Sequence, residues 1–512
     1  MNEKSSRKPT DAQAGSTGEA AGIGTAVGGV RSTMDSGQLD LWALSAETRS
    51  WLKSVGRDAA CPHASTRREG AGDGSREITT PQKLQHLQET LYRKAKAEPG
   101  YRFWSLYGEL TRHDLLEHAL RLVVRNGGAP GVDGESLKTI TATPEAQTQW
   151  LDTVRRELKD KTYRPAPVRR VYLPKADGGQ RPLGIPTVKD RVVQMALLLV
   201  MGSIFEADFH PRSFGFRPGR NAHQALEEIV SALQSGRLEV VDADLSKYFD
   251  TIPHDRLMKL VARRTSDGAV LHLIRAWLDA PVMEERDGRR HLLPNRQGVP
   301  QGGGISPLLA NLYLNALDWG VNDPGVRGQP VLVRYADDFV ILCAPGKGQA
   351  LRERLEQWLR PRGLKLNEQK TQVTDSRQGF DFLGFRVRWQ PHRVTGRWYA
   401  HVEASPRSRH RLRDAVRAKL NHWTLWQRTP EAIAGVNRLL RGWAGYFHFR
   451  HSSRVMKKAN QHACERVRRW LWRKHRQTKT LWKDYPEELL YGRYGLWRMP
   501  EHAAWKNSRR EN

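Results

Sequence analysis

Cysteine is scarce in this sequence: its 512 residues include only Cys61, Cys343 and Cys464, which are widely separated and odd in number. A disulfide framework or a zinc knuckle needs paired cysteines at short spacing, so neither can be built from these three. The two close Cys/His pairs, Cys61 with His63 and His462 with Cys464, each lack a matching second pair. We therefore interpret the thiols as buried or idle rather than metal-binding.

Long apolar runs are missing as well. No stretch approaches the roughly 18 residues that a membrane-spanning helix requires, and the first residues lack the apolar core of a signal peptide. We therefore expect an intracellular, cytoplasmic protein with no membrane partner. Acidic residues are few beside basic ones, 55 Asp and Glu against 84 Lys and Arg, which leaves a net charge of +29. Such an excess favours a polyanionic partner, and nucleic acid is the commonest one.

The chain has enough apolar residues to fold, with 38% hydrophobic content and 17 Trp. Its length suits about three domains. Residues 1–80 are rich in Gly, Ala, Ser and Thr, and their ten Lys and Arg balance ten Asp and Glu. This segment is predicted to be mostly flexible. All of the excess positive charge therefore lies after residue 80.

The most informative stretch is 331–343, where two runs of β-forming residues flank a short polar step. It predicts a tight hairpin with Asp337 and Asp338 at its tip. Adjacent Asp residues in a turn are common and mean little alone. A second apolar strand, 240–245, also ends in acid at Asp244. Three carboxylates at strand ends can converge on hard divalent cations, as phosphoryl-transfer chemistry requires.

The part of the chain before these strands begins with helical spacing over 82–124, followed by a rigid turn at 129–134. Residues 168–185 predict a hairpin that carries Lys175 and Arg181 close together. Paired cations on a rigid hairpin suit a triphosphate. A solvated basic hairpin is an equally good interpretation.

A mostly apolar helix is predicted over 191–205, followed by a basic turn with two aromatics at 214–220 and by another helix over 253–264. Phe249 stands five residues after Asp244. If Asp244 holds a metal, Phe249 would flank the sugar of an incoming nucleotide and exclude a 2′-hydroxyl by crowding. A place in the core is the alternative for a single Phe.

The segment 297–307 contains three consecutive glycines, which let the backbone come close to another surface. Ser306 and Pro307 predict an N-cap and the first residue of a helix. A glycine loop at a helix start can meet a phosphate or a base pair. Such loops are also often simple turns.

The C-terminal half predicts a helix over 348–359 and a pair of strands around 380–387. Lys370 between them is a candidate for steering a pyrophosphate, or an ordinary surface lysine. Residues 401–475 hold 18 Lys and Arg against 4 Asp and Glu, with clear helical spacing. Their aromatics, such as Trp423, are predicted to be mostly core, and the arginines on the opposite faces favour an RNA or DNA surface.

Taken together, these segments resemble a reverse transcriptase of the group II intron type over roughly residues 82–475. Residues 335–338, Tyr-Ala-Asp-Asp, match the catalytic signature of that family. The segment 300–302 matches the family's loop near template and primer, and the segments 364–371 and 382–384 match its last two polymerase blocks. The resemblance therefore rests on several motifs in the family's order.

Two further segments narrow the resemblance. Residues 131–134 resemble the end of an N-terminal extension that intron and CRISPR-associated reverse transcriptases share. Gly442-Trp443-Ala444-Gly445-Tyr446-Phe447 resembles the maturase domain, which separates the chain from retron and abortive-infection relatives. No endonuclease signature follows residue 475, so we expect the nuclease domain to be absent.

The fold that the resemblance implies is α+β, a right-hand polymerase with fingers and palm around an antiparallel sheet, in residues 81–400. An α-helical thumb and maturase domain would follow in 401–475. Residues 476–512 would form a short C-terminal appendage, a candidate for DNA binding. The extension 1–80 lies outside the resemblance.

The resemblance also implies a site. Two Mg²⁺ ions would be held by Asp244, Asp337, Asp338 and Leu245, of which the three Asp are catalytic. Nucleotide-binding residues would be Lys175, Arg181, Phe249, Gln301 and Lys370. Template and primer would meet Gly302, Gly303 and Gly304. Intron RNA would meet Arg407, Arg409, Arg411, Arg413, Arg417, Arg441, Trp443 and Tyr446.

The implied activity is RNA-directed DNA synthesis, combined with binding of the chain's own group II intron RNA, help in splicing and intron mobility by target-primed reverse transcription. The implied partners are that RNA, an RNA template with a DNA primer, deoxynucleoside triphosphates and target DNA. Two alternatives stay open. One is a reverse transcriptase of a CRISPR or phage-defence system, and the other is a maturase that only assists splicing.

Overall fold

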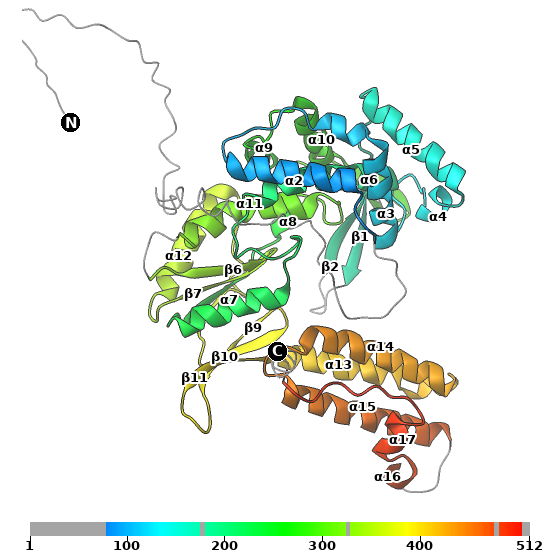
Figure 1. Ribbon diagram of the computed structural model, residues 1–512, viewed down its shortest axis with the longest axis vertical. Coiled ribbons are helices and arrows are strands. Elements are labelled where there is room, and N and C mark those ends of the chain that lie inside the picture. The colour runs from blue at the N-terminus through cyan, green and yellow to red at the C-terminus, as the bar shows by residue number, and fades with distance from the viewer. Residues whose placement is uncertain (1–77, 175–179, 324–327, 476–480, 504–512) are drawn as a thin grey trace, which may run out of the picture. The chain divides into compact units, whose positions relative to one another are not determined.

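The structure, a computed structural model, describes residues 78–174, 180–323, 328–475 and 481–503 (Figure 1). All of them belong to one unit of the chain, residues 41–512. Residues 1–77, including Cys61, and Lys175 lie outside the described residues. The predicted flexibility of the extension 1–80 therefore stays a prediction. No helix of the described ranges is long and apolar enough to span a membrane.

The first part of the chain is mainly helical. Its elements are α2 (Gln82–Ala97), η2 (Tyr107–Thr111), α3 (His113–Asn126), α4 (Leu137–Ile140), α5 (Pro144–Lys159) and α6 (Val188–Glu206). Both α2 and α3 pack against α6. Because α6 is apolar on nearly every side, it is buried among its neighbours. The helical spacing predicted over 82–124 is confirmed as two helices with a 3₁₀ turn between them.

The predicted hairpin at 168–185 is confirmed as β1 (Val168–Pro174) and β2 (Gln180–Ile185). β1 also pairs in parallel with β4 (Val282–Arg286), which pairs with β5 (Arg289–Leu293). The sheet order is β2-β1-β4-β5. Of Arg181, the structure describes the backbone position, which pairs with Leu173. We call this sheet with α2–α6 the fingers region.

The central sheet has the order β6-β7-β3-β8 and is antiparallel throughout. Its strands are β3 (Glu239–Ala243), β6 (Val331–Tyr335), β7 (Asp338–Cys343) and β8 (Gln372–Asp375). Three helices cover it: α7 (Ala222–Gln234), α11 (Ser306–Val321) and α12 (Gly348–Leu359) (Figure 1). We call this sheet with its helices the palm.

Both faces of the palm sheet are buried. Val241 and Ile341 belong to the core that α11 and α12 share, whereas Val240 and Val340 belong to a second core with α7. A strand buried on both faces is apolar at successive positions rather than at alternate ones. This explains the unbroken apolar run 339–343 in β7 and the adjacent Val240 and Val241 in β3.

The palm also includes short helices at its edge: α8 (Tyr248–Thr251), α9 (His254–Val261) and α10 (Gly268–Asp279). The helix predicted over 253–264 therefore ends earlier than expected, at Val261. The N-cap prediction for Ser306 is wrong: Ile305 is the cap, and the Ser306 hydroxyl donates to the Pro300 carbonyl oxygen at 2.8 Å. That bond holds the preceding glycine loop instead of the helix start.

A third sheet, of order β11-β10-β9, follows the palm: β9 (Phe380–Phe382), β10 (Phe385–Pro391) and β11 (Trp398–Ala404). Leu383 and Gly384 form the two-residue turn between β9 and β10, with φ of 49° and 80°. Two successive positive φ values characterise the type I′ turn, which matches the twist of paired strands. The strand pair predicted near 380–387 is confirmed.

The chain then becomes helical again, with α13 (Pro406–Lys419), η4 (His422–Thr424), α14 (Thr429–Phe447), α15 (Ser453–Lys474), α16 (Leu481–Asp484) and α17 (Glu487–Tyr491). One apolar core joins them and includes Leu440, Trp470, Leu490 and Met499. The C-terminal segment thus shares its core with α13–α15. We call residues 406–503 the thumb region. The predicted α+β class, a sheet-containing polymerase part followed by helices, is confirmed.

Trp423 corrects one sequence prediction. Its side chain is 75% exposed in the loop between α13 and α14, and nearby Trp426 is 80% exposed. Helical spacing placed Trp423 on the apolar stripe with Leu412. Because α13 ends at Lys419, that spacing no longer applies to Trp423.

Candidate active site

The two strands that carry the predicted acids are direct neighbours. β3 and β7 are antiparallel, and Ala243 pairs with Phe339. Asp244 follows Ala243 and Asp338 precedes Phe339, so the register carries both carboxylates to the same edge and the same face of the sheet. Asp244 is half-buried and Asp338 is exposed.

The turn between β6 and β7 carries the third acid. Tyr335 pairs with Asp338, so Ala336 and Asp337 form a two-residue turn, and the predicted hairpin is confirmed. Ala336 has φ of 61°, a left-handed value that is uncommon for a residue with a Cβ. The surroundings must therefore hold this turn in place.

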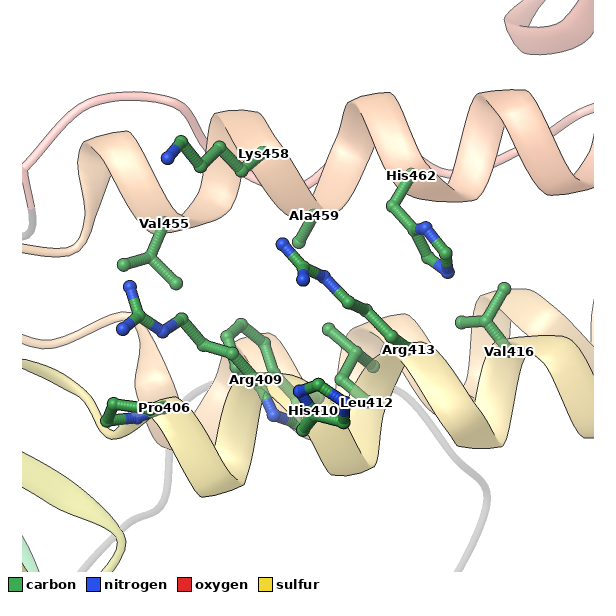
Figure 2. A pocket seen from close by; sticks show the side chains of 11 residues that line it. Pro406, Arg409, His410, Leu412, Arg413, Val416, Val455, Lys458, Ala459 and His462 are labelled. Carbon is green, nitrogen blue, oxygen red and sulfur yellow. The ribbon is translucent and has the colours of Figure 1, made fainter.

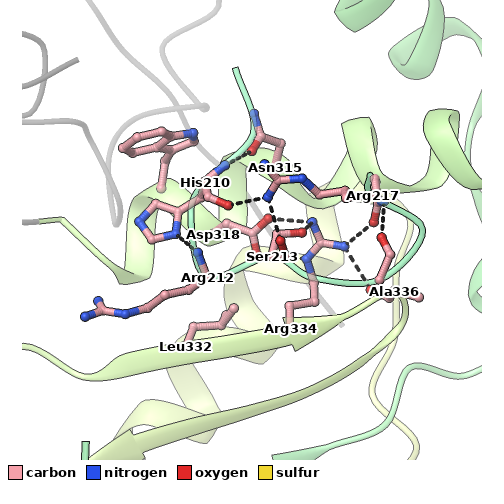
Figure 3. A network of polar contacts seen from close by, with 12 residues as sticks. His210, Arg212, Ser213, Arg217, Asn315, Asp318, Leu332, Arg334 and Ala336 are labelled. Carbon is pink, nitrogen blue, oxygen red and sulfur yellow. Dashed lines mark hydrogen bonds and ion pairs between the residues drawn. The ribbon is translucent and has the colours of Figure 1, made fainter. Parts of the chain in front are cut away.

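Arg334, just before the turn, supplies part of that support (Figure 3). Its side chain is fully buried, and its Nε and Nη2 donate to both carboxylate oxygens of Asp318 at 2.8 and 2.5 Å. Nη1 donates to the Ala336 carbonyl oxygen at 2.9 Å and to Asn311 at 2.7 Å, while Nη2 also reaches the Ser213 hydroxyl at 2.7 Å. A planar, forked cation thus ties the turn to α11.

The backbone of 212–215 supports the same turn from another side. Arg334 N donates to the Arg212 carbonyl oxygen at 3.0 Å, and Phe214 N donates to the Arg334 carbonyl oxygen at 2.9 Å. A Cβ on Gly215 would lie 2.3 Å from the Ala336 nitrogen. Only glycine allows this approach, so the basic aromatic segment 214–220 has a structural role at the site.

Arg217 belongs to the same buried cluster. It forms an ion pair with Glu206 at 2.6 Å and donates to the carbonyl oxygens of His210 and Ser213 at 2.6 and 2.5 Å. Burial and the nearby arginines, Arg212 first, lower the pKa of His210 to about 3. His210 is therefore a neutral ring, whose Nδ1 accepts from Arg212 N at 3.0 Å. None of these contacts was visible in the sequence.

Asp242 is an acidic residue of the site that the sequence analysis did not select. It lies two residues before Asp244 on β3, hence on the same face of the strand. Burial and the nearby carboxylates of Asp338 and Asp244 raise the pKa of Asp242 to about 7. Its spacing of two from Asp244 was the signal that could have found it.

The segment that follows α12 closes the acidic edge. Asn367 N donates to the Asp244 carbonyl oxygen at 2.8 Å, and Ser246 N donates to the Lys365 carbonyl oxygen at 2.9 Å. The same segment places Lys370 Nζ 3.6 Å from Asp244 Oδ2. Lys370 therefore brings a cation to Asp244, and its contact with a pyrophosphate stays a prediction.

Phe249 lies on α8, directly after the strand that leads to Asp244. Its side chain is half-buried, and its ring meets the ring of Tyr248 edge to face at 5.4 Å. The Phe249 carbonyl oxygen accepts from Val299 N at 2.6 Å. This bond joins the sugar-selecting candidate to the glycine segment 297–307.

The glycine segment is packed against the fingers region. Gly184 on β2 donates its N–H to the Gln301 carbonyl oxygen at 2.7 Å, and a Cβ on Gly302 would lie 2.3 Å from the Gly184 carbonyl oxygen. Gly303 and Gly304 pack against α6. Close packing thus accounts for the glycines. Contacts of this segment with nucleotide, template and primer stay predictions.

The residues at the acidic edge suit a divalent cation, although no group of three His, Cys, Asp or Glu within the described ranges is arranged to hold one. Mg²⁺ is usually bound by one or two carboxylates, with substrate phosphates and water completing its shell. Carboxylates at Asp244 and Asp338 provide that minimum, and Asp337 stands beside them in the turn. The edge therefore fits a metal that arrives with a triphosphate.

The predicted RNA-binding residues lie on two helices of the thumb region. They are Arg407, Arg409, Arg411, Arg413 and Arg417 on α13, and Arg441, Trp443 and Tyr446 on α14. The arginines are exposed, apart from half-buried Arg409, which pairs with Glu403 at 3.4 Å. The Arg441 guanidinium lies 5.7 Å from the Trp497 ring.

Tyr446 has partners within the protein. Its hydroxyl donates to the Leu383 carbonyl oxygen at 3.0 Å, and its carbonyl oxygen lies 2.7 Å from His223 Nε2. Its ring centroid is 5.4 Å from that of Phe385. The maturase-like motif thus joins the thumb region to the palm and the third sheet, and an RNA contact of Tyr446 stays a prediction.

Two family profiles match the chain in this order. The profile described as reverse transcriptase (RNA-dependent DNA polymerase) matches residues 173–387. The profile described as group II intron, maturase-specific domain matches residues 407–486. The first contains the palm acids, and the second contains α13–α15.

Known proteins with similar sequences agree with these profiles. Protein YkfC of Escherichia coli K12 is 37% identical over 346 residues, which cover 59% of this chain and 88% of YkfC. The group II intron-encoded protein LtrA of Lactococcus lactis is 30% identical over 349 residues, 56% of this chain and 57% of LtrA. An uncharacterized 91 kDa protein in the cob intron of Schizosaccharomyces pombe is 38% identical over 168 residues, 33% of this chain and 20% of that protein.

The chain thus spans little more than half the length of LtrA, but most of YkfC. The polymerase signature, the maturase-like motif and their order agree with what both profiles cover. This chain belongs to the family of group II intron reverse transcriptases that carry a maturase domain.

Proposed function

We propose that this protein is an RNA-directed DNA polymerase that also binds its own group II intron RNA, assists its splicing and supports intron mobility by target-primed reverse transcription. One observation carries the proposal: the register of β3 and β7 brings Asp244 and Asp338 to one edge beside the Asp337 turn, in a chain that continues into a maturase-type helical region. The maturase match favours an intron partner over CRISPR or phage-defence roles.

The chain's own residues would perform the positioning that phosphoryl transfer needs. The template and the primer terminus would lie against the acidic edge, beside the glycine segment. Phe249 would limit the space at the sugar and favour deoxynucleotides. Lys370, with Lys175 and Arg181, would hold the charge of the triphosphate and of the departing pyrophosphate.

Family members generally use divalent metal ions, and two Mg²⁺ ions are the proposal for this chain. Asp244, Asp337, Asp338 and the backbone at Leu245 would hold them, and the bound ions would activate the primer 3′-hydroxyl and neutralise charge on the phosphates. Burial and the neighbouring carboxylates raise the pKa of Asp242 to about 7, and cations bound at this edge would oppose that shift.

The polymerase part is tested by Asp337→Asn, which removes a negative charge with little change in shape. Incorporation of deoxynucleotides on an RNA template should fall by about 10⁴-fold, because several kcal/mol of transition-state stabilisation are lost. Intron RNA affinity should stay unchanged. Asp414→Asn on α13 is the matched control and should polymerise normally. Retained polymerisation by Asp337→Asn would refute the assignment of the catalytic acids.

The splicing part rests on charge in the thumb region. Compact intron RNA repels itself, and a protein that binds the folded form more tightly than the open form stabilises it. Changing Arg407, Arg411 and Arg417 together to Gln should weaken intron RNA binding about 10- to 100-fold and flatten its salt dependence. Splicing should slow, while Asp337→Asn should splice at the normal rate. Unchanged salt dependence in the triple variant would contradict the electrostatic mechanism.

A further inference from the structure

A cavity of about 270 Å³ opens between α13, α14 and α15 (Figure 2), and none of the polymerase acids lines it. Its volume is just below the range of roughly 300–1,000 Å³ of typical small-molecule sites. The residues that line it are Pro406, Arg409, His410, Leu412, Arg413, Val416, Trp443, Val455, Lys458, Ala459 and His462. The proposed polymerase function does not use this cavity.

The inner surface of the cavity is apolar and aromatic. Leu412 and Val416 from α13 and Val455 and Ala459 from α15 contribute aliphatic groups, and Trp443 from α14 contributes an indole. The Trp443 Nε1–H is buried and donates to no group within the described residues. A buried donor without an acceptor is costly, so a ligand with an acceptor at its edge would gain from this position.

The mouth of the cavity is cationic. Arg409 and Arg413 extend from α13 toward α15, where Lys458 faces them (Figure 2). No carboxylate lines the cavity, and within the described ranges Arg413 and Lys458 have none at ion-pair distance. Burial lowers the pKa of His462, so this ring is suited to hydrogen bonding as a neutral group. The cavity therefore suits a flat, polar-edged group attached to an anion.

A second and larger hollow, of about 760 Å³, adjoins the first and shares Pro406 and Arg409 with it. Five arginines line this hollow, against two carboxylates, those of Glu403 and Glu501. The arginines are Arg386, Arg388, Arg393, Arg409 and Arg454. An open, basic surface of this kind matches consecutive phosphates.

We infer that the cavity takes one unstacked base of a single-stranded RNA segment, with the flanking phosphates on Arg409, Arg413 and the adjoining basic hollow. The inference rests on the proposed RNA binding by the thumb region and assigns a recognition site within it. Sequence-specific RNA recognition commonly uses bases that leave the stack and lie on aromatic or arginine planes. A base inside a duplex could not enter, so the site would distinguish single strands from helices.

Ala459→Leu tests the inference, because it fills the cavity without changing charge. The matched control is Ala418→Leu, at an exposed position of α13. The full chain is titrated with a fluorescein-labelled 12-nucleotide RNA strand and with the RNA duplex of the same sequence. Ala459→Leu should bind the single strand about tenfold more weakly, since stacking of one base is worth roughly that factor. Its duplex affinity should equal that of the unchanged protein, which also verifies folding.

A second measurement does not depend on a variant. The unchanged protein is irradiated with a 4-thiouridine strand, and the crosslinked peptides should include Trp443. Crosslinks confined to other regions would overturn the inference. So would an Ala459→Leu variant whose affinity fell equally for the single strand and the duplex, or fell for neither. If the unchanged protein bound neither RNA, the proposed RNA binding would fail together with the cavity. If the unchanged protein bound both RNAs and Ala459→Leu bound them with the same affinities, only the cavity assignment would fail.

Discussion

The surroundings of the active-site turn and helix α13 of the thumb region use arginine in opposite ways. Beside the turn, the Arg334–Asp318 ion pair is 0% exposed on both sides, and the pair between Arg217 and Glu206, at the end of α6, is nearly as buried. In the thumb region, most arginines of α13 are exposed, and the pair Arg417–Asp414 is more than half exposed. The buried arginines beside the turn position backbone, whereas the exposed arginines on α13 are available to an external anion.

The thumb region also contains a buried arginine, Arg468, and it too has a structural role. Arg468 is 1% exposed, but its Nε donates to the Tyr485 carbonyl oxygen at 2.7 Å and its guanidinium lies 3.8 Å from the Trp482 ring. It joins the C-terminal segment to α15 and faces no solvent. Burial, and not the region alone, decides whether an arginine is structural here.

The largest effect should follow from breaking the palm pair. Arg334→Met leaves the Asp318 carboxylate buried without its partner, which should cost about 3–5 kcal/mol of unfolding free energy, measured by urea denaturation. The double variant with Asp318→Leu should recover most of that stability, because no buried charge remains. It should not recover polymerisation, since the Ala336 carbonyl oxygen still lacks its donor.

Asp414→Asn breaks the exposed Arg417–Asp414 ion pair of the thumb region and is the comparison for Arg334→Met. An exposed ion pair contributes about 0–1 kcal/mol, so this change should leave the denaturation midpoint nearly unshifted. If Asp414→Asn cost as much as Arg334→Met, the proposed division between positioning and available arginines would be wrong. If the double palm variant regained full polymerisation, Arg334 would be a stability residue and not a positioning one.

The next largest effect is expected at Gly215, which packs against the active-site turn. Gly215→Ala would place a Cβ 2.3 Å from the Ala336 nitrogen and must displace the turn that carries Asp337. A misplacement of about 1 Å can cost about 10²-fold in rate, so single-turnover incorporation should fall by about that factor while RNA affinity holds. Gly435→Ala on α14 is the control, since nothing lies within 4 Å of its added Cβ. It should gain about 0.5–1 kcal/mol of stability. Normal incorporation by Gly215→Ala would show that the turn tolerates displacement.

Strongly patterned elements were predictable from the sequence. The helix predicted over 348–359 is confirmed as α12, and the hairpins at 168–185 and 331–343 are confirmed. Apolar periodicity and turn residues are local signals, which explains this success. The same signals predicted Asp244 and Asp337 at the ends of apolar strands, which was enough to propose a shared site.

Contacts between distant segments were not predictable. Arg334 pairs with Asp318 across 16 residues and meets Ser213 across 121, and no local pattern encodes either contact. The same holds for Ser306, whose hydroxyl turned to Pro300 rather than to its own helix. The core prediction for Trp423 was wrong because the apolar periodicity continues in the sequence beyond Lys419, where α13 ends.

The smallest effect is a pH dependence that arises where His210 is buried beside the active-site turn. The pKa of His210 is lowered to about 3, below the value of about 6.5 in an unfolded chain. Between these values the unfolded chain binds more protons, so stability is complete above pH 6.5 and is lost as the pH falls toward 3. At pH 5 the loss should be about 2 kcal/mol, since one pKa unit corresponds to about 1.4 kcal/mol.

His210→Gln should remove that part of the pH dependence, because its amide oxygen can still accept from Arg212 N but cannot be protonated in this range. Urea denaturation at pH 5 and pH 7 measures the difference. His410→Gln, at an exposed position of α13, is the control and should keep the full difference. If the two variants lost the same amount between pH 7 and pH 5, acid sensitivity would belong to the whole chain. The acid sensitivity would then not come from His210. The contrast between the surroundings of the active-site turn and the thumb region would be limited to their ion pairs.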